Sequence, residues 1–203
     1  MIPRPFPIDP RLLAFDIDGV VADTMALFVR LAHEKYGLTG ISKEDISCYN
    51  LSECLRMERH ILEDLVGLIL DDEHTMQILP FPGAREVLTE LAKAAPLRFV
   101  TARLQSESIS RWLFTILSGV PEERIKVIAS GSPENKVEIL NGLEVRYFVE
   151  DRIETCRHLK QVGIEPLVFD QPWNRSAPAD GFIRICNWIQ LREWVLPSNA
   201  ELE

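Results

Sequence analysis

Two aspartates, Asp16 and Asp18, stand two residues apart directly after the short apolar segment of residues 12–15. If that segment is a buried strand, residues i and i+2 point the same way, and Gly19 allows a sharp turn after them. Like charges this close are costly unless a cation neutralises them, and Mg²⁺ prefers oxygen ligands. One carboxylate can attack phosphorus, and the other can act as general acid and base. Taken alone, however, the Asp-x-Asp-Gly pattern is more typical of a helix-capping loop.

Other polar residues fall where further strands are predicted to end. They are Thr101 after residues 97–100, Lys136 in the first turn of the helix after residues 125–128, and Glu150 and Asp151 after residues 147–149. In a parallel sheet, ligands bind at the carboxyl ends of the strands, so these residues are expected to lie together. A lysine at a helix N-terminus opposes the helix dipole, which indicates that Lys136 points at an anion.

Together these residues provide what phosphoryl transfer needs. We expect Asp16 to be the nucleophile and Asp18 the acid and base. Thr101 and nearby backbone N–H groups would hold the phosphoryl oxygens, while Lys136 neutralises the charge of the phosphate and of Asp16.

The expected cofactor is Mg²⁺, which would shield negative charge as the nucleophile approaches the phosphate. Asp151 is predicted to bind the metal, with Glu150 holding a metal-bound water. The predicted partner is therefore a small phosphorylated substrate.

Strand and helix patterns alternate from residue 80 onward, which predicts an α/β fold with a Rossmann-like parallel sheet and helices on both faces. The expected strands are residues 12–15, 97–100, 125–128, 147–149, 166–169 and 181–185. The expected helices between and after them are residues 82–94, 107–117, 132–141, 153–161 and 188–196.

Residues 24–79 interrupt this alternation and contain no convincing strand. Helices are expected at residues 25–36 and 57–70, with Ser42, Ser52 and Asp71 capping short helices. We expect residues 1–23 and 80–203 to form a catalytic core and residues 24–79 a helical cap that covers the site. The alternative is that these helices only pack on the core.

The composition narrows the class of protein. The chain of 203 residues is 46% hydrophobic, with a net charge of -9 and a pI of about 5.0. That acidity argues against a nucleic-acid polymer or an anionic membrane surface as partner. The N-terminus lacks a signal-peptide pattern, and no apolar run is long enough to span a membrane. Four cysteines without a CxxC pair are typical of reduced thiols, so a cytoplasmic location is expected.

The motifs as a set resemble those of a known family. Asp16-Ile17-Asp18-Gly19-Val20, Phe99-Val100-Thr101, Lys136 and Glu150-Asp151 are similar, in order, to the four signature motifs of the haloacid dehalogenase superfamily of phosphohydrolases. The resemblance covers about residues 12–170, with residues 24–79 in the place of a helical cap. It implies an aspartyl-phosphate intermediate, a Mg²⁺ requirement, and a metal contact from the backbone carbonyl of Asp18.

Within that superfamily the chain most resembles the 5'(3')-deoxyribonucleotidase group and its uncharacterised bacterial relatives. The features are the Asp-x-Asp-Gly-Val-x-Ala-Asp pattern ending at Asp23, the Glu150-Asp151-Arg152 run and the compact cap. The resemblance implies a nucleoside monophosphate substrate. That group typically has an aromatic residue just after the last aspartate, where this chain has Thr24. Phe28 and Tyr49 are the candidates to replace it as a platform for the base.

Further candidate substrate contacts lie in loops that follow strands. They are Ala102, Arg103, Trp173 and Asn174. Trp173 can stack on a ring, or it can pack on the last helix in an ordinary surface turn. Arg103 can contact phosphate, or it can be the partner of a structural ion pair.

Other activities remain open at this point. A phosphatase of a small sugar or organic-acid phosphate, a phosphomutase and a ligand-binding protein without activity all fit the fold. A dehalogenase would need neither a metal nor a carboxylic acid at position 18, so Asp18, Glu150 and Asp151 argue against it. Loss of catalysis usually removes Asp16, Asp18 or Lys136, and the chain has all three.

Overall fold

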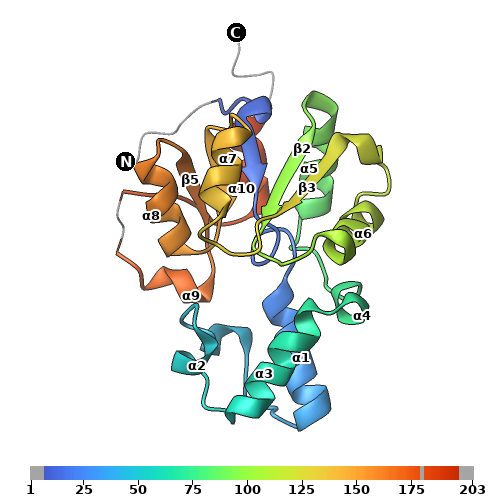
Figure 1. Ribbon diagram of the computed structural model, residues 1–203, viewed down its shortest axis with the longest axis vertical. Helices are drawn as coiled ribbons and strands as arrows, with labels where there is room; N and C mark the ends of the chain where they lie inside the picture. The colour runs from blue at the N-terminus through green and yellow to red at the C-terminus, as the bar shows by residue number, and fades with distance from the viewer. Residues whose placement is uncertain (1–6, 179–180, 197–203) are drawn as a thin grey trace.

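A computed structural model of the chain describes residues 7–178 and 181–196. Its centre is a sheet of six parallel strands in the order β3-β2-β1-β4-β5-β6 (Figure 1). The strands are β1 (Leu13–Phe15), β2 (Leu97–Thr101), β3 (Ile125–Ala129), β4 (Tyr147–Glu150), β5 (Glu165–Phe169) and β6 (Ile183–Ile185). The strand order reverses between β1 and β4, and such a switch point is where open α/β sheets bind ligands.

Helices cover both faces of the sheet, as predicted. Those of the core are α5 (Ala84–Ala94), α6 (Glu107–Ile116), α7 (Lys136–Gly142), α8 (Ile153–Gln161), α9 (Pro172–Arg175) and α10 (Trp188–Val195). Alternation along β1 divides the core: Leu13 and Phe15 pack with α5, α6 and α10, whereas Ala14 packs with α7 and α8. Burial of these strands on both faces explains their continuous apolar sequence.

The helical insertion, residues 24–79, forms the lower half of the molecule in Figure 1. Its helices are α1 (Thr24–Tyr36), α2 (Leu51–Cys54), α3 (Arg59–Leu70) and α4 (Asp72–Thr75), with a 3₁₀ turn, η2, at Lys43–Asp45. The chain enters and leaves the insertion side by side, because the Asp23 N–H donates to Leu79 O at 2.9 Å and the Phe81 N–H donates to Val21 O at 2.9 Å. These two bonds make a narrow connection to the sheet.

Several element boundaries differ from the sequence prediction. Leu12 belongs to a 3₁₀ turn, η1 (Pro10–Leu12), because Asp9 caps it and Pro10 favours its first position. The helix expected from residue 132 begins at Lys136, after a turn. Ser42 and Asp71 do cap short helices, but Asn50 rather than Ser52 is the N-cap of α2. The helix α9 was not predicted, and the sixth strand, expected at residues 181–185, is limited to Ile183–Ile185.

Candidate active site

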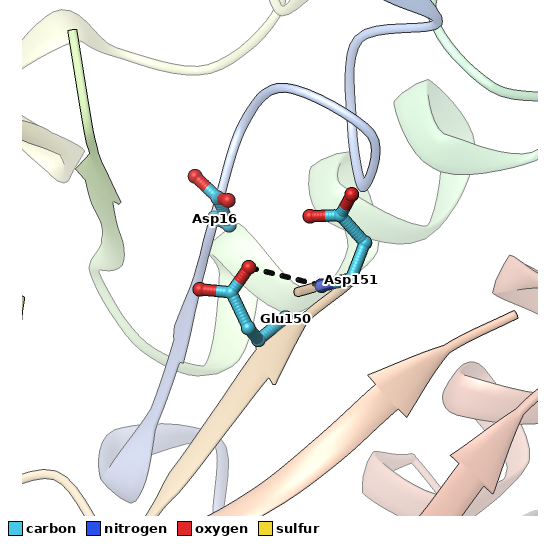
Figure 2. Close-up of side chains that lie close together, drawn as sticks. All are labelled: Asp16, Glu150 and Asp151. Atoms are coloured by element: carbon cyan, nitrogen blue, oxygen red, sulfur yellow. Dashed lines mark hydrogen bonds between the residues drawn. The ribbon is translucent and has the colours of Figure 1, made fainter. Parts of the chain in front are cut away.

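Four motif residues meet at the carboxyl edge of the sheet. Asp16 follows β1, Thr101 ends β2, Glu150 ends β4 and Lys136 begins α7. Figure 2 shows the carboxylates of Asp16, Glu150 and Asp151 converging from two neighbouring strands. One oxygen of each lies within 4.8 Å of one oxygen of the others. The strand-end rule therefore placed these side chains correctly.

Lys136 is the cation of this cluster. Its Nζ lies 2.6 Å from Asp16 Oδ2 and donates to Glu150 Oε2 at 2.9 Å, and the side chain is fully buried. Burial alone would lower the pKa of Lys136, but the two carboxylates hold that pKa well above its usual 10.5. The lysine is therefore charged, and it points at anions as its place in the helix predicted.

The three carboxylates outnumber this single ammonium group. Burial, with Glu150 nearby, raises the pKa of Asp16 well above its usual 3.8, even though Lys136 opposes the shift. Burial, Glu150 and Asp16 raise the pKa of Asp151 in the same way. Two raised pKa values among oxygen donors mark a shortage of positive charge. The donor set therefore fits a hard divalent cation such as Mg²⁺, which Asp16 and Asp151 could hold.

Glu150 has both oxygens in use. Oε2 accepts from Lys136, and Oε1 accepts from the backbone N–H groups of Asp151 at 3.1 Å and Arg152 at 3.0 Å. Burial would raise the pKa of Glu150, but Lys136 and the hydrogen bond from the Arg152 N–H together lower it. In the structure Glu150 therefore accepts from Lys136 and from two backbone N–H groups, and its expected role toward a metal-bound water stays a prediction.

Asp18 has separate partners. Thr24 Oγ1 donates to its Oδ1 at 2.6 Å, and Arg103 donates from Nε to Oδ2 and from Nη2 to Oδ1, each at 2.9 Å. Burial would raise the pKa of Asp18, but the Arg103 guanidinium lowers it. Arg103, a candidate substrate contact, is therefore the ion-pair partner of Asp18. Thr24 stands at the position that is typically aromatic in deoxyribonucleotidases, and here its hydroxyl donates to Asp18.

Helix α9 holds Asp151 in place through two hydrogen bonds. Trp173 Nε1 donates to Asp151 Oδ2 at 2.7 Å, and Asn174 Nδ2 donates to the backbone oxygens of Asp151 and Phe169, each at 2.8 Å. Asn174 is 1% exposed and lines no part of the cavity. We therefore correct its assignment from substrate contact to structural support.

Gly19 allows the β1 loop to approach Asp151 closely. A Cβ added to Gly19 would lie 2.5 Å from Asp151 Oδ2, and the residue has a φ of +78°. Gln171, which was not predicted, fixes the same loop because its Nε2 donates to Gly19 O at 2.7 Å. Only glycine fits this position without strain.

A cavity of about 580 Å³ lies between these groups and the helical insertion. Asp16, Asp18, Asp151, Ala102 and Arg103 line its polar end. The insertion contributes an apolar wall from Met25, Ile46, Leu51, Leu62, Val66, Ile69 and Leu70. The combination of a charged end and an apolar wall suits a ligand with a charged group and a largely apolar body.

Of the three aromatic residues proposed to contact the substrate, two line the cavity and one does not. Tyr49 and Trp173 both line the cavity, and the Tyr49 ring lies 4.8 Å from the Arg152 guanidinium. Phe28 is 0% exposed in the main hydrophobic cluster and does not line the cavity. Its assignment as a base platform is therefore corrected: it lies on the face of α1 that packs inward with Leu27 and Leu31.

The residues of α3 that form part of the apolar cavity wall were not predicted from the sequence. Leu62 and Val66 are only half-buried although they are large and apolar, one turn apart on the same helix. Apolar residues that remain partly exposed on an otherwise packed helix are the signal that marks a lining surface. The sequence predicted the helix at residues 57–70 but singled out neither residue.

The fold and site define a hydrolase of the haloacid dehalogenase superfamily, and solved structures agree. The haloacid dehalogenase-like family protein SP0104 from Streptococcus pneumoniae matches with a TM-score of 0.55 at 13% identity, covering 88% of this chain and 95% of that one. CbbY from Rhodobacter sphaeroides, solved in complex with phosphate, matches with a TM-score of 0.54 at 20% identity, also covering 88% and 95%. At these identities the likeness shows the fold.

The family model described as "5' nucleotidase, deoxy (Pyrimidine), cytosolic type C protein" matches residues 10–200, and the chain belongs to this family. "Putative nucleotidase YqfW" from Bacillus subtilis (strain 168) is 23% identical over 186 residues, which are 90% of this chain and 92% of the relative. The chain is accordingly a phosphoric monoester hydrolase. Among the residues that the structure describes, no helix is both long and apolar enough to span a membrane.

Proposed function

We propose that the protein is a Mg²⁺-dependent phosphatase that hydrolyses nucleoside monophosphates through an aspartyl-phosphate on Asp16. The observation that carries this proposal is the Lys136–Asp16 pair at 2.6 Å, placed at the polar end of a cavity with an apolar far wall. A charged nucleophile held beside a cation is suited to attack a phosphate, and the wall suits a nucleobase.

The first step transfers the phosphoryl group to the protein. Lys136 and the Ile17 N–H, which donates to Asp16 Oδ1 at 2.7 Å, hold the nucleophile in place. Asp16 attacks phosphorus and the bond from phosphorus to the ester oxygen breaks. Asp18 must first take up a proton, because Arg103 lowers its pKa in the substrate-free site, and it then gives that proton to the departing oxygen. Backbone N–H groups of the loop after β2 would bind the phosphoryl oxygens, because Ala102 of this loop lines the cavity. Thr101 is fully buried outside the cavity lining, and its Oγ1 accepts from the Arg103 N–H at 3.3 Å.

The second step restores the enzyme. Asp18 takes a proton from water, the water oxygen attacks phosphorus, and the bond to Asp16 breaks to release inorganic phosphate. When bound by Asp16 and Asp151, Mg²⁺ supplies the positive charge that lets an anionic substrate approach these carboxylates. The Asp18 carbonyl is our third proposed ligand, by resemblance to the family.

The leaving group would lie between the sheet edge and the helical insertion. Tyr49 and Trp173 offer rings on which a base can stack, and α3 supplies apolar surface. We therefore propose that residues 24–79 act as a cap over a core formed by residues 1–23 and 80–203. We also propose a cytoplasmic location, which the family description "cytosolic type C" supports.

Phosphate release tests this proposal. Wild-type protein would be assayed with Mg²⁺ and with EDTA on deoxyribo- and ribonucleoside monophosphates, sugar phosphates and phosphoglycolate. We expect preference for nucleoside monophosphates and loss of activity in EDTA. Sugar-selective turnover would retain the phosphatase and overturn the nucleotide substrate, and silence on the whole panel would favour a mutase or a binding protein.

Two variants test the covalent mechanism. Asp16→Asn should abolish turnover, because an amide cannot attack phosphorus. Asp18→Asn should slow turnover by about 10²–10⁴-fold with binding largely kept, as expected for loss of a general acid and base. Near-normal activity of Asp16→Asn would rule out the aspartyl-phosphate.

A further inference from the structure

The residues proposed to hold Mg²⁺ come from two separate loops. Asp16 and the Asp18 carbonyl belong to the loop after β1, and Asp151 belongs to the loop after β4. The ladder between these strands reaches Asp16, whose N–H donates to Val149 O at 2.9 Å. Among the described residues, no backbone hydrogen bond joins the two loops beyond that point. The gap between them must therefore be set by side chains.

The short helix α9 binds both loops. At its start, Gln171 Nε2 donates to Gly19 O in the loop after β1 at 2.7 Å. One turn later, Asn174 Nδ2 donates to Asp151 O in the loop after β4 at 2.8 Å. Gln171 is 2% exposed and Asn174 is 1% exposed. Gln171 and Asn174 therefore form a buried bridge between the loops, called here the α9 bridge.

The bridge is itself held in one orientation. Asn174 Oδ1 accepts from the Gln171 N–H at 3.2 Å and from Arg184 Nη1 at 2.9 Å, so its Nδ2 must face Asp151. Arg184 Nη2 also donates to Asn174 O at 2.7 Å. Because Arg184 lies on β6, these bonds attach α9 to the edge of the sheet.

Gln171 also affects the direction of the Asp18 carbonyl. Gly19 donates its N–H to Ala22 O at 2.9 Å and accepts from Gln171 at its own carbonyl. In a trans peptide the Asp18 carbonyl points opposite to the Gly19 N–H. With both backbone groups of Gly19 bonded, the Asp18 carbonyl has one direction.

The two loops are also prevented from moving closer. A Cβ added to Gly19 would lie 2.5 Å from Asp151 Oδ2, so the Gly19 backbone already packs against this carboxylate. Packing thus sets the smallest gap, and the α9 bridge keeps the gap from widening. The distance between the two sets of oxygen donors is therefore limited in both directions.

We propose that Gln171 is a positioning residue that selects Mg²⁺ over the larger Ca²⁺ by keeping the loop after β1 close to Asp151. Mg²⁺ requires six oxygens at about 2.0–2.1 Å in near-octahedral geometry, whereas Ca²⁺ accepts more ligands at about 2.3–2.6 Å in flexible arrangements. This inference rests on the proposed function, because it takes both loops as metal-binding. It goes further by assigning the choice of ion to a residue that supplies no ligand.

Metal binding in the absence of substrate tests the proposal. MgCl₂ and, separately, CaCl₂ would be titrated calorimetrically into metal-free wild-type protein and Gln171→Met. Methionine keeps the length of the side chain and removes the donor. We expect Gln171→Met to bind Mg²⁺ about 10-fold more weakly and Ca²⁺ within about threefold of wild type, because a wider gap still suits the larger ion.

A second variant acts on the other half of the bridge. Arg184→Met removes the bonds that orient Asn174, and its side chain is 27% exposed, so the variant should fold. We expect a smaller loss of Mg²⁺ affinity with the same preference. The control is Gln190→Met, which removes the bond from the Cys186 N–H to Gln190 Oε1 at 2.8 Å, outside the cavity lining. It should bind both ions like wild type.

Equal weakening of Mg²⁺ and Ca²⁺ in Gln171→Met, with a lowered melting temperature, would give Gln171 a purely structural role and overturn the proposal. Unchanged affinity for both ions would also overturn it. Wild-type protein that binds no Mg²⁺ would reject this inference together with the metal requirement. Wild-type protein that binds Mg²⁺ but hydrolyses no nucleotide would reject only the proposed substrate, because the ion preference is measured without it.

Discussion

Gly19 shows how much one residue contributes to this site. The sequence predicts a turn there, and the structure adds that the missing side chain leaves space for the Asp151 carboxylate. Because an added methyl group would lie 2.5 Å from an Asp151 oxygen, the loop and the carboxylate cannot both keep their positions. Gly19→Ala should therefore lose at least about 10-fold in activity and about 1 kcal/mol in the free energy of unfolding.

Gly37 provides a matched control for this change. It also has a positive φ, of +65°, but no atom lies within 4 Å of an added Cβ. Gly37→Ala should show a similar loss of stability in urea unfolding and keep wild-type kcat/KM. If both variants lost activity equally, backbone strain rather than displacement of Asp151 would be the cause.

Trp173 is predicted to act on the metal site through its indole N–H. That group donates to Asp151 Oδ2, and hydrogen bonds that orient a ligand carboxylate typically change metal affinity about 10–100-fold. Trp173→Phe retains a ring in the cavity but removes the donor, so we expect Mg²⁺ to bind about 10-fold more weakly. Calorimetric titration of Mg²⁺ measures this, with Trp194→Phe as the control. Unchanged affinity would leave Trp173 with a role only in the cavity wall.

At the residue level, the sequence predicts which side chains belong to the site better than it predicts which residues they contact. Asp16 and Asp151 were predicted from their places after strands and Lys136 from its place at the start of the helix that follows β3, since topology alone brings such positions together. Asn174 and Phe28 were misassigned because the direction of a side chain depends on packing that no local pattern encodes. Gln171 was missed for the same reason, because its partner Gly19 is 152 positions away.

At the level of elements, the start of α1 connects the sheet to the helical insertion. Asp23 caps the helix by accepting from Ala26 N at 3.2 Å and from Lys43 Nζ at 2.7 Å. Asp23→Ala removes both bonds, so we expect a loss of about 1 kcal/mol in the free energy of unfolding. The change should also raise KM, because η2 would no longer be tied to this connection.

Asn187 caps α10 in the same way, accepting from Gln190 N at 2.9 Å, and does not line the cavity. Asn187→Ala is therefore the control: it should cost similar stability in urea unfolding without changing KM. A normal KM in Asp23→Ala would show that the connection does not influence substrate binding.

The elements themselves were largely predictable. Apolar runs of strand length between amphipathic helices indicated all six strands, since both faces of a parallel sheet are buried. Helix α9 was not predicted because it has only four residues, and its proline and capping box read equally well as a turn. Helix α7 starts late because Ser132 and Pro133 form a turn before Lys136 instead of a first helical turn.

At the scale of the whole molecule, the insertion and the core share one cavity, and their arrangement could not be derived from the sequence. Periodicity identifies an amphipathic helix but does not tell whether its apolar face covers a core or a ligand. Half-buried Leu62 and Val66 on α3 line the same cavity as Asp16, Asp18 and Asp151, because the insertion lies next to the carboxyl edge of the sheet (Figure 1). Tyr49 on the insertion and Arg152 on the core, with ring and guanidinium 4.8 Å apart, contact each other across the same boundary.

The charge balance of the site makes the stability of the whole protein depend on pH and metal together. The folded pKa values of Asp16 and Asp151 lie well above 3.8, so without metal the folded state binds more protons than the unfolded state over that interval. Stability must therefore fall as pH rises from about 3.8 through the raised values. Asp18 and Glu150 have lowered pKa values, so the stability that their charged forms contribute is lost only as the pH falls into the acidic range.

Mg²⁺ should counteract this dependence of stability on pH, because it binds the deprotonated carboxylates and its affinity increases as they lose their protons. In EDTA we expect the melting temperature to decline as pH rises above about 4, and saturating Mg²⁺ should remove most of that decline. Asp151→Asn replaces one of the two carboxylates, so it should flatten the EDTA profile and weaken the response to Mg²⁺. Parallel profiles with and without Mg²⁺ would mean that Asp16 and Asp151 do not hold the metal, and the cation would then have to bind elsewhere.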